Sequence, residues 1–214
     1  TDAAVSWLQE AKTDTIGFII VSDNKDKCPQ GVALASAKGT AYLPWTLVQT
    51  LELWLSDSAI NKITYDIKAA LNAFSQVGLV IEGPVDDVLL ASYLLNPTLD
   101  GRSLHRLARE YLELDLPQRT KRCDLPRDTE EAIWCVQATT VEELMPVLAK
   151  QLAVDGLMDL YREVELPLAA VLAEMEQTGV CVDKKMLHQM GIKIGTRMHE
   201  VEQDIFSLVG EEFN

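Results

Sequence analysis

The sequence predicts an α/β fold, with a mixed central sheet flanked by helices, followed by a long helical extension. An apolar, β-branched run occupies residues 16–22, and short strand-like segments follow it as far as residue 65. Beyond residue 65, apolar residues recur mainly at spacings of three and four, which is typical of helices. Strands first and helices afterwards indicate α/β layers over residues 1–155 and a helical extension over residues 156–214.

The first strand is expected at the centre of the sheet. Residues 16–22, which read IGFIIVS, are apolar at consecutive positions, as expected of a strand that is buried on both faces. Residues 32–37 and 40–43 flank a turn at Gly39, and they are predicted to form a hairpin because glycine allows the positive φ of a tight turn. A further short strand is predicted at residues 62–65.

Helices are predicted where apolar residues recur at helical spacing: at residues 47–55, 67–76, 88–95, 104–112, 128–154 and 157–178. Asp86 and Asp87 are expected to cap the third of these helices, and Ser103 is expected to cap the fourth. Residues 114–127, which contain two prolines, are expected to form an irregular loop. Pro167 is expected to bend or restart the helix that contains it.

The last predicted helix has the most regular pattern in the chain, since its apolar residues follow one another at +3 or +4 from residue 187 to residue 208. Asp183 is expected to cap this helix and Gly210 to end it. Such a long one-sided apolar stripe must pack against something. Core packing or an antiparallel helix partner is a better interpretation than a ligand site.

The composition predicts a soluble, acidic protein without a membrane segment. The chain has 214 residues, 48% of them apolar, and no apolar run approaches the length that crosses a bilayer. Its net charge of −14, from 19 Lys and Arg against 33 Asp and Glu, opposes strong binding to a polyanion. Basic residues gather in one stretch: Arg102, Arg106, Arg109, Arg119, Lys121, Arg122 and Arg127. A solvated loop rim is the favoured interpretation of this stretch, and a patch that contacts DNA phosphates is the alternative.

The cysteines show no metal-binding spacing. Cys28, Cys123, Cys135 and Cys181 are widely separated and form no Cys-x-x-Cys pair, so reduced thiols and a cytoplasmic location are expected. The chain opens at Thr1 without a basic and apolar leader, and we expect it to be a piece of a longer protein.

Two segments resemble a known family. Residues 85–112, which read VDDVLLASYLLNPTLDGRSLHRLAREYL, are similar to the central helices of the DnaQ-like exonuclease domain in bacterial family A DNA polymerases, the DNA polymerase I enzymes. Residues 165–214, which include ELPLAAVLAEMEQTGVCVD and GEEFN, resemble the segment that leads from this domain into the polymerase thumb. The resemblance implies a ribonuclease H-like fold, with a 3'-5' exonuclease-like domain at residues 1–155 and a helical linker with the beginning of the thumb at residues 156–214.

In this family, several carboxylates hold two divalent ions, which lie about 3.5 to 4 Å apart in two-metal sites. They come from an Asp-x-Glu pair on the first central strand, from an Asp at the start of the helix after the next inner strand, and from an Asp four residues after a Tyr on a late helix. Alignment to this pattern places Gly17 and Ile19 at the pair and Ala70 at the second site. It places Gln137 at the third site and Ile133 at the tyrosine. The resemblance therefore implies that the catalytic and metal-binding side chains are lost, and Ile19 and Ala70 are expected to pack in the core.

The resemblance implies a catalytically inactive exonuclease-like domain of a DNA polymerase I that takes part in DNA replication and repair. Such a domain would serve as a structural platform for the polymerase domain, its intramolecular partner. No enzyme activity, metal or cofactor is expected in this fragment, whereas the parent chain would be a DNA-directed DNA polymerase that uses Mg²⁺. DNA binding is expected through the full-length polymerase and only weakly, if at all, through the fragment. No membrane contact is expected, and the expected location is the bacterial cytoplasm and nucleoid.

Two alternatives remain open. The first is an active proofreading exonuclease whose metal carboxylates have moved to other acidic residues: Asp23, Asp66, Asp86, Asp87, Glu130 and Glu131. Helix capping is the favoured interpretation of Asp66 and of the pair Asp86 and Asp87, and a first helical turn is the favoured place of Glu130 and Glu131. The second alternative is a protein-interaction or DNA-contacting module that uses the loop at residues 114–127.

Overall fold

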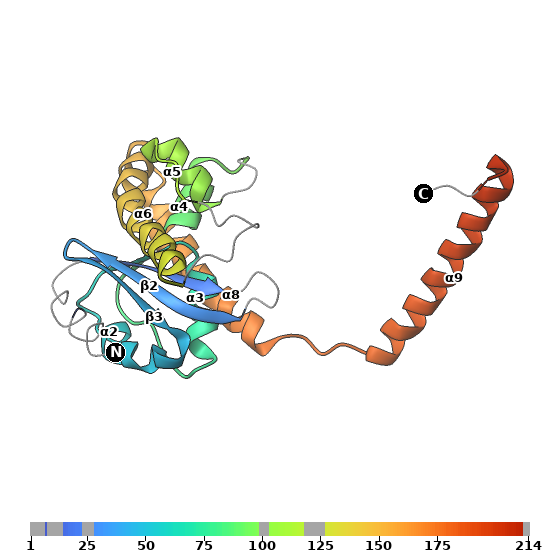
Figure 1. Cartoon of the computed structure of the whole chain (residues 1–214), viewed down its shortest axis with the longest axis horizontal. Helices are drawn as coiled ribbons and strands as arrows, with labels where there is room; N and C mark the ends of the chain where they lie inside the picture. Colours follow the sequence, from blue (N-terminus) through green and yellow to red (C-terminus); the bar gives the residue numbers. More distant parts are fainter. Residues whose placement is uncertain (1–6, 8–14, 23–27, 99–102, 118–126, 212–214) are drawn as a thin grey trace. The chain divides into compact units, whose positions relative to one another are not determined.

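The structure of the whole chain is a computed structural model (Figure 1). It describes residue 7 and residues 15–22, 28–98, 103–117 and 127–211, with only the backbone for residues 127–129. The chain divides into two compact units, Thr1–Gln177 and Thr178–Asn214, and each is described by itself.

The first unit is built on a five-stranded mixed sheet with the strand order β3-β2-β1-β4-β5. Its strands are β1 (Ile16–Ser22), β2 (Pro29–Ser36), β3 (Gly39–Pro44), β4 (Lys62–Thr64) and β5 (Val85–Asp87). Strand β1 pairs antiparallel with β2 and parallel with β4, so its predicted central position is confirmed. The predicted β2–β3 hairpin is also confirmed. Strand β5 was not predicted, because it has only three residues and two of them are Asp.

The helices of the first unit follow the predicted order, with differences in detail. They are the 3₁₀ helix η1 (Trp45–Leu51), α2 (Glu52–Leu55), α3 (Ile67–Ser75), α4 (Val88–Leu95), α5 (Leu104–Leu112), α6 (Arg127–Val154), α7 (Met158–Leu160), the π-helix η2 (Tyr161–Glu165) and α8 (Leu166–Thr178). Asp87 caps α4 and Ser103 caps α5, as predicted. Asp86 does not act as a cap and lies buried in β5. The single helix expected from residue 157 is three joined pieces, and Pro167 lies in the first turn of α8.

Each face of the sheet carries its own apolar core, because successive side chains of β1 point to opposite faces. On one face, Ile19 and Val21 pack in a cluster that includes residues of α4, α5 and α6. On the other face, Ile16 and Phe18 pack in a cluster with residues of η1, α2 and α3. Figure 1 shows α4, α5 and α6 grouped together on one side of the sheet.

The first unit continues past residue 155, where the sequence placed the end of the α/β domain. Tyr161, Ala169 and Ala173 are buried, and the unit ends at Gln177. The reason is that η2 and α8 cover residues of the sheet and of α3, contacts that are invisible in a linear pattern. The helical extension is therefore divided between the two units.

Lys62, in β4, is a fully buried lysine. Its Nζ donates hydrogen bonds to the carbonyl oxygens of Asp57 at 2.8 Å, Ile60 at 3.3 Å and Glu82 at 2.7 Å. Burial lowers the pKa of Lys62, while the charges of Asp57 and Glu82 act in the opposite direction. The ammonium group thus holds together the two loops that border β4.

Replacing Lys62 with Met, which keeps the length of the side chain, is expected to destabilise the first unit by about 2 kcal/mol. The loss follows because three carbonyl groups at the sheet end lose their donor. Urea denaturation followed by circular dichroism measures it. Lys150→Met, at an exposed position of α6, is the matched control and is expected to leave the midpoint nearly unchanged. Equal midpoints for both variants would contradict the assigned role.

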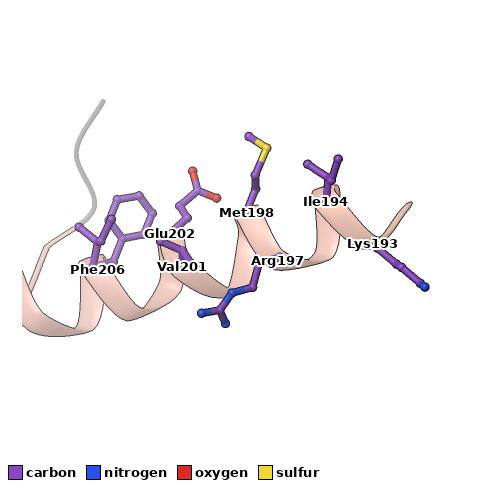
Figure 2. A pocket seen from close by; sticks show the side chains of 8 residues that line it. Lys193, Ile194, Arg197, Met198, Val201, Glu202 and Phe206 are labelled. Carbon is purple, nitrogen blue, oxygen red and sulfur yellow. The ribbon is translucent and has the colours of Figure 1, made fainter. Parts of the chain in front are cut away.

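In the described part of the second unit, residues 178–211, the chain forms the helix α9 (Lys184–Val209). Asp183 caps it by accepting from the amides of Lys185 and Met186, and Gly210 ends it with a φ of 86°, as predicted. Figure 2 shows part of its apolar stripe, with Ile194, Met198 and Val201 exposed. Within the described part of the chain, no helix combines the length and the apolar character needed to cross a membrane.

Candidate nuclease site

Gly17 lies on β1 against helix α6, with no space for a side chain. A Cβ atom built on Gly17 would lie 2.8 Å from the carbonyl oxygen of Ala138 and 3.2 Å from the amide nitrogen of Glu142. Both are backbone atoms in the middle of a long helix, so neither can turn away as a flexible side chain would. At this position the strand and the helix are in direct contact.

Ile19 is the second residue of the strand pair, on the same face of β1. Its side chain is 7% exposed and belongs to the core cluster that also contains Val21, Ala33 and Ala138. The expectation that Ile19 packs in the core is confirmed. An apolar side chain offers no ligand to a divalent cation.

Ala70 is buried, as expected, but the structure does not bring it to Gly17 and Ile19. It belongs to the cluster on the opposite face of the sheet, with Phe18 and Phe74. The placement of the second acidic site at Ala70 is therefore wrong. The residue at the start of the helix after β4 is Asp66, one turn earlier, and it is the N-cap of α3. The rotation of α3 about its axis decides which of its residues face the sheet. The sequence pattern gives no information on this rotation.

Asp66 therefore retains an acidic group where the family pattern has one. Its side chain is half-buried and accepts a hydrogen bond from the amide of Ala69 at 3.0 Å, as an N-cap does. The sequence signal for this position was the Asp that stands two residues after the last residue of β4, Thr64.

On α6, the residue that faces Gly17 is Ala138 rather than Gln137. Ala138 is fully buried, whereas Gln137 and Ile133 are half-buried. Trp134, one turn before Ala138, packs on Tyr42 with ring centroids 5.0 Å apart. The one-residue difference leaves the position neutral, because alanine has no more charge than glutamine.

Glu142 lies near Gly17 and was not predicted, because it stands five residues after Gln137, the position aligned with the third acidic residue. Its Cβ would be 3.0 Å from a Cβ on Gly17. Among the residues whose side chains the structure describes, no three His, Cys, Asp or Glu side chains come together in a way that would hold a metal ion. The described residues of this site therefore do not fit a two-metal centre, which requires several converging carboxylates.

Asp87 is fully occupied by structural hydrogen bonds. Its carboxylate accepts from the amides of Ile67 at 2.7 Å, Leu89 at 2.7 Å and Leu90 at 3.1 Å. Burial raises the pKa of Asp87 from 3.8 to about 7, and the nearby charge of Asp66 adds to this effect, although the three amide donors oppose it. The side chain joins the beginnings of α3 and α4.

Asp86 is also engaged in the protein interior. It forms an ion pair with Arg162 at 3.2 Å and accepts a hydrogen bond from the Tyr161 hydroxyl at 3.3 Å. The Tyr161 oxygen in turn accepts from the amide of Asp87 at 2.7 Å. Burial, followed by the charge of Asp86, raises the pKa of Tyr161 above its ordinary value. This network attaches η2 to the edge of the sheet.

Glu130 and Glu131, the remaining acidic candidates that the structure describes, belong to no metal-binding group. Both lie in the first turns of α6, are half-buried and already interact with other groups. Asp23 lies outside the described residues.

Of the basic residues, Arg106 and Arg109, both on α5, are the ones whose side chains the structure describes, and Arg127 is described by its backbone alone, at the start of α6. Arg109 forms an ion pair with Asp115 at 2.5 Å, and both residues are largely exposed. Together with Ser103, His105 and other residues, the two arginines line a polar hollow of about 430 Å³. The other candidates lie outside the described residues: Arg102, Arg119, Lys121 and Arg122.

A sequence profile described as "DNA polymerase I, ribonuclease H-like domain" matches residues 16–118. The chain is 34% identical to DNA polymerase I of Geobacillus stearothermophilus, over 91% of this chain and 24% of the relative. It is 32% identical to DNA polymerase I of Mycobacterium tuberculosis strain H37Rv, over 97% of this chain and 25% of the relative. The chain thus spans about a quarter of the length of these curated relatives.

Solved structures show the same fold. The POL domain of Pol1 from M. smegmatis, in complex with DNA primer-template and dNTP, superposes with a TM-score of 0.76 at 25% identity. That match covers 98% of this chain and 37% of the other. NrnC of Brucella melitensis with bound Mg²⁺ superposes with a TM-score of 0.65 at 16% identity, over 80% of this chain and 89% of the other, a likeness of fold alone.

Proposed function

Since this chain belongs to the family of ribonuclease H-like domains of DNA polymerase I, we propose that it is a domain of this family without nuclease activity. Its role is that of a structural platform for a polymerase domain in the parent protein. The parent is a DNA-directed DNA polymerase that uses Mg²⁺, acts in replication and repair in the bacterial cytoplasm, and contacts DNA mainly outside this fragment.

The close contact between β1 and α6 at Gly17 is the observation that carries this proposal. A nuclease of the two-metal type needs carboxylates on this strand and space for ions and a DNA strand beside them. Here the backbone carbonyl oxygen of Ala138 lies only 2.8 Å from the place that a Cβ atom would take, and Ile19 fills the next position of the same face. Both the ligands and the volume are therefore missing at the strand pair.

The role of the helical region follows from the same resemblance. Residues 156–214 are proposed to be the linker and the beginning of the polymerase thumb. The buried network of Tyr161, Asp86 and Asp87 supports this role, because it ties the start of the linker rigidly to the sheet. The exposed apolar stripe of α9 is consistent with a helix that packs in a larger protein.

Active proofreading with relocated carboxylates receives less support. Glu142 lies near Gly17, and Asp66 stands at the start of the helix after β4, where the family pattern has an Asp; both favour this alternative. However, Asp86 and Asp87 are buried in structural hydrogen bonds, and the strand pair contributes no acidic group.

Incubation of the purified chain with 5'-labelled single-stranded DNA and Mg²⁺ or Mn²⁺ is expected to leave the DNA at full length, because the carboxylates needed for two metals do not converge. Asp66→Asn is the matched variant, since Asn keeps the helix cap but removes the charge. Metal-dependent shortening from the 3' end that is present in the wild type and abolished in Asp66→Asn would refute the proposal.

A further inference from the structure

Helix α8 ends the first unit beside α3, and the space between these two helices is only partly filled. Two open hollows, of about 240 Å³ and 300 Å³, are lined by residues of both helices and share Leu71, Ile81 and Ala170 in their linings. On α8, the buried residues are the small side chains Ala169 and Ala173. Apolar packing alone therefore leaves the end of α8 loosely held.

Polar side chains hold that end instead. Glu176 accepts hydrogen bonds from Lys68 Nζ at 2.5 Å and from Asn72 Nδ2 at 2.7 Å. Gln177 donates from Nε2 to Asn72 Oδ1 at 3.1 Å and accepts at Oε1 from Ser75 Oγ at 2.9 Å. We call these five residues the α3–α8 clasp.

The clasp is a continuous chain of hydrogen bonds. Lys68, Asn72 and Ser75 stand four and three residues apart, so they share one face of α3. In both Asn72 and Gln177, the side-chain amide nitrogen donates one hydrogen bond and the amide oxygen accepts another. Each amide group can therefore make both bonds in one orientation only. The Lys68–Glu176 hydrogen bond raises the pKa of the lysine and lowers that of the glutamate. A shift of α8 along α3 by one residue would break every one of these bonds.

We propose that the α3–α8 clasp fixes the register of α8 on α3 and thereby the point at which the chain leaves the first unit. The clasp occupies the last two residues of that unit, and Gly179, with a φ of 67°, turns the chain immediately after α8. The inference rests on the proposed function, since a platform has to present the following helix from a defined place.

The effect of the clasp is local. Exposed ion pairs and hydrogen bonds contribute little to global stability, because water competes for both partners. Four of them at the end of one helix suffice to keep its last turns from fraying, but they do not determine whether the sheet and α6 fold. Loss of the clasp is thus expected to appear as local opening rather than as unfolding.

The test is Asn72→Asp in the whole 214-residue chain, which places a carboxylate against Glu176 without changing the size of the side chain. Amide hydrogen exchange in residues 170–178 is expected to become about tenfold faster, while exchange in the buried part of α6 and the thermal midpoint stay nearly unchanged. Ser75→Ala, which removes only the last bond, is expected to give a smaller acceleration at the same residues.

Gln151→Glu is the matched control, because it creates the same amide-to-acid change on α6 opposite Asp155. It is expected to leave α8 unaffected. Unchanged exchange in α8 after Asn72→Asp, or equal acceleration throughout the first unit, would overturn the clasp. Neither readout involves DNA, so failure of the clasp leaves the nuclease assay as an independent test of the proposed function.

Discussion

Gly17→Asp is expected to destabilise the first compact unit by about 3 kcal/mol or more, through overpacking and through burial of an unpaired charge. The new Cβ would meet the carbonyl oxygen of Ala138 at 2.8 Å, and the carboxylate would be placed beside Glu142. Urea denaturation followed by circular dichroism measures the loss, with the near-ultraviolet signal of the tryptophans as a report on the core.

Two variants separate the causes of this loss. Gly17→Ala introduces the steric conflict without the charge and is expected to cost less than Gly17→Asp. Gly195→Asp makes the same substitution on α9, where the built Cβ has no described atom within 4 Å beyond the adjoining residues and the helix's own backbone, and it is expected to leave the first unit unchanged. Wild-type stability of Gly17→Asp would show that α6 can move away from β1, and the account of a closed site would then fail.

Adding acidic residues at the strand pair is thus not expected to create a nuclease. A substituted side chain must first displace a helix that spans Arg127–Val154 and packs on the sheet along its length. Lack of space at the strand pair thus prevents a metal site there even when the charge is supplied.

Asp87→Ala is expected to destabilise the first unit by about 3 kcal/mol. Three backbone amides, those of Ile67, Leu89 and Leu90, lose their acceptor in a buried place, and each unpaired donor costs about 1 to 3 kcal/mol before relaxation. Asp66→Ala is the matched control, since it also removes an N-cap Asp, but one that is half-buried with one amide partner. It is expected to cost about 1 kcal/mol. Equal losses for the two variants would contradict the role given to burial.

The Asp87 effect should depend on pH. Because the folded protein raises the pKa of Asp87 from 3.8 to about 7, folding favours the protonated carboxyl. This contribution to the free energy of unfolding is complete below pH 3.8 and is lost as the pH rises through about 7. The difference in stability between wild type and Asp87→Ala should therefore be larger at pH 5 than at pH 8. A larger difference at pH 8 would mean that the amide donors outweigh desolvation.

The elements set by local chemistry were predictable from the sequence. Consecutive apolar residues predicted strand β1, and Gly39 predicted the turn of the hairpin. Asp183 and Gly210 predicted the two ends of α9. In each case the determining interaction lies within a few residues of the element. Strand β5 was not predicted, because its three residues form a strand by pairing with β4, which lies about twenty residues earlier in the sequence.

The candidate site was predictable in composition but not in geometry. That the strand β1 carries no acidic residue was readable from the sequence alone. The errors at Ala70 and Gln137 share one cause, since the sequence does not reveal how a helix is rotated against the sheet it covers. The network of Tyr161 with Asp87 joins residues 74 positions apart, a separation at which no periodic pattern gives information. Inactivity and DNA contact stay predictions until measured.

The π-helix η2 fixes the number of residues that the chain can have between the sheet and α8. In a regular α-helix each residue turns the direction of the side chain by about 100°, so eight residues would leave Tyr161 and Ala169 about 80° apart around the axis. The wider turn takes up one additional residue and brings both side chains toward the interior, where both are buried. Deleting a single residue here would turn every downstream side chain of α8 by roughly a quarter of a circle. Insertions and deletions between the sheet and α8 are thus expected to be excluded in evolution, even though most substitutions at the same exposed positions would be accepted.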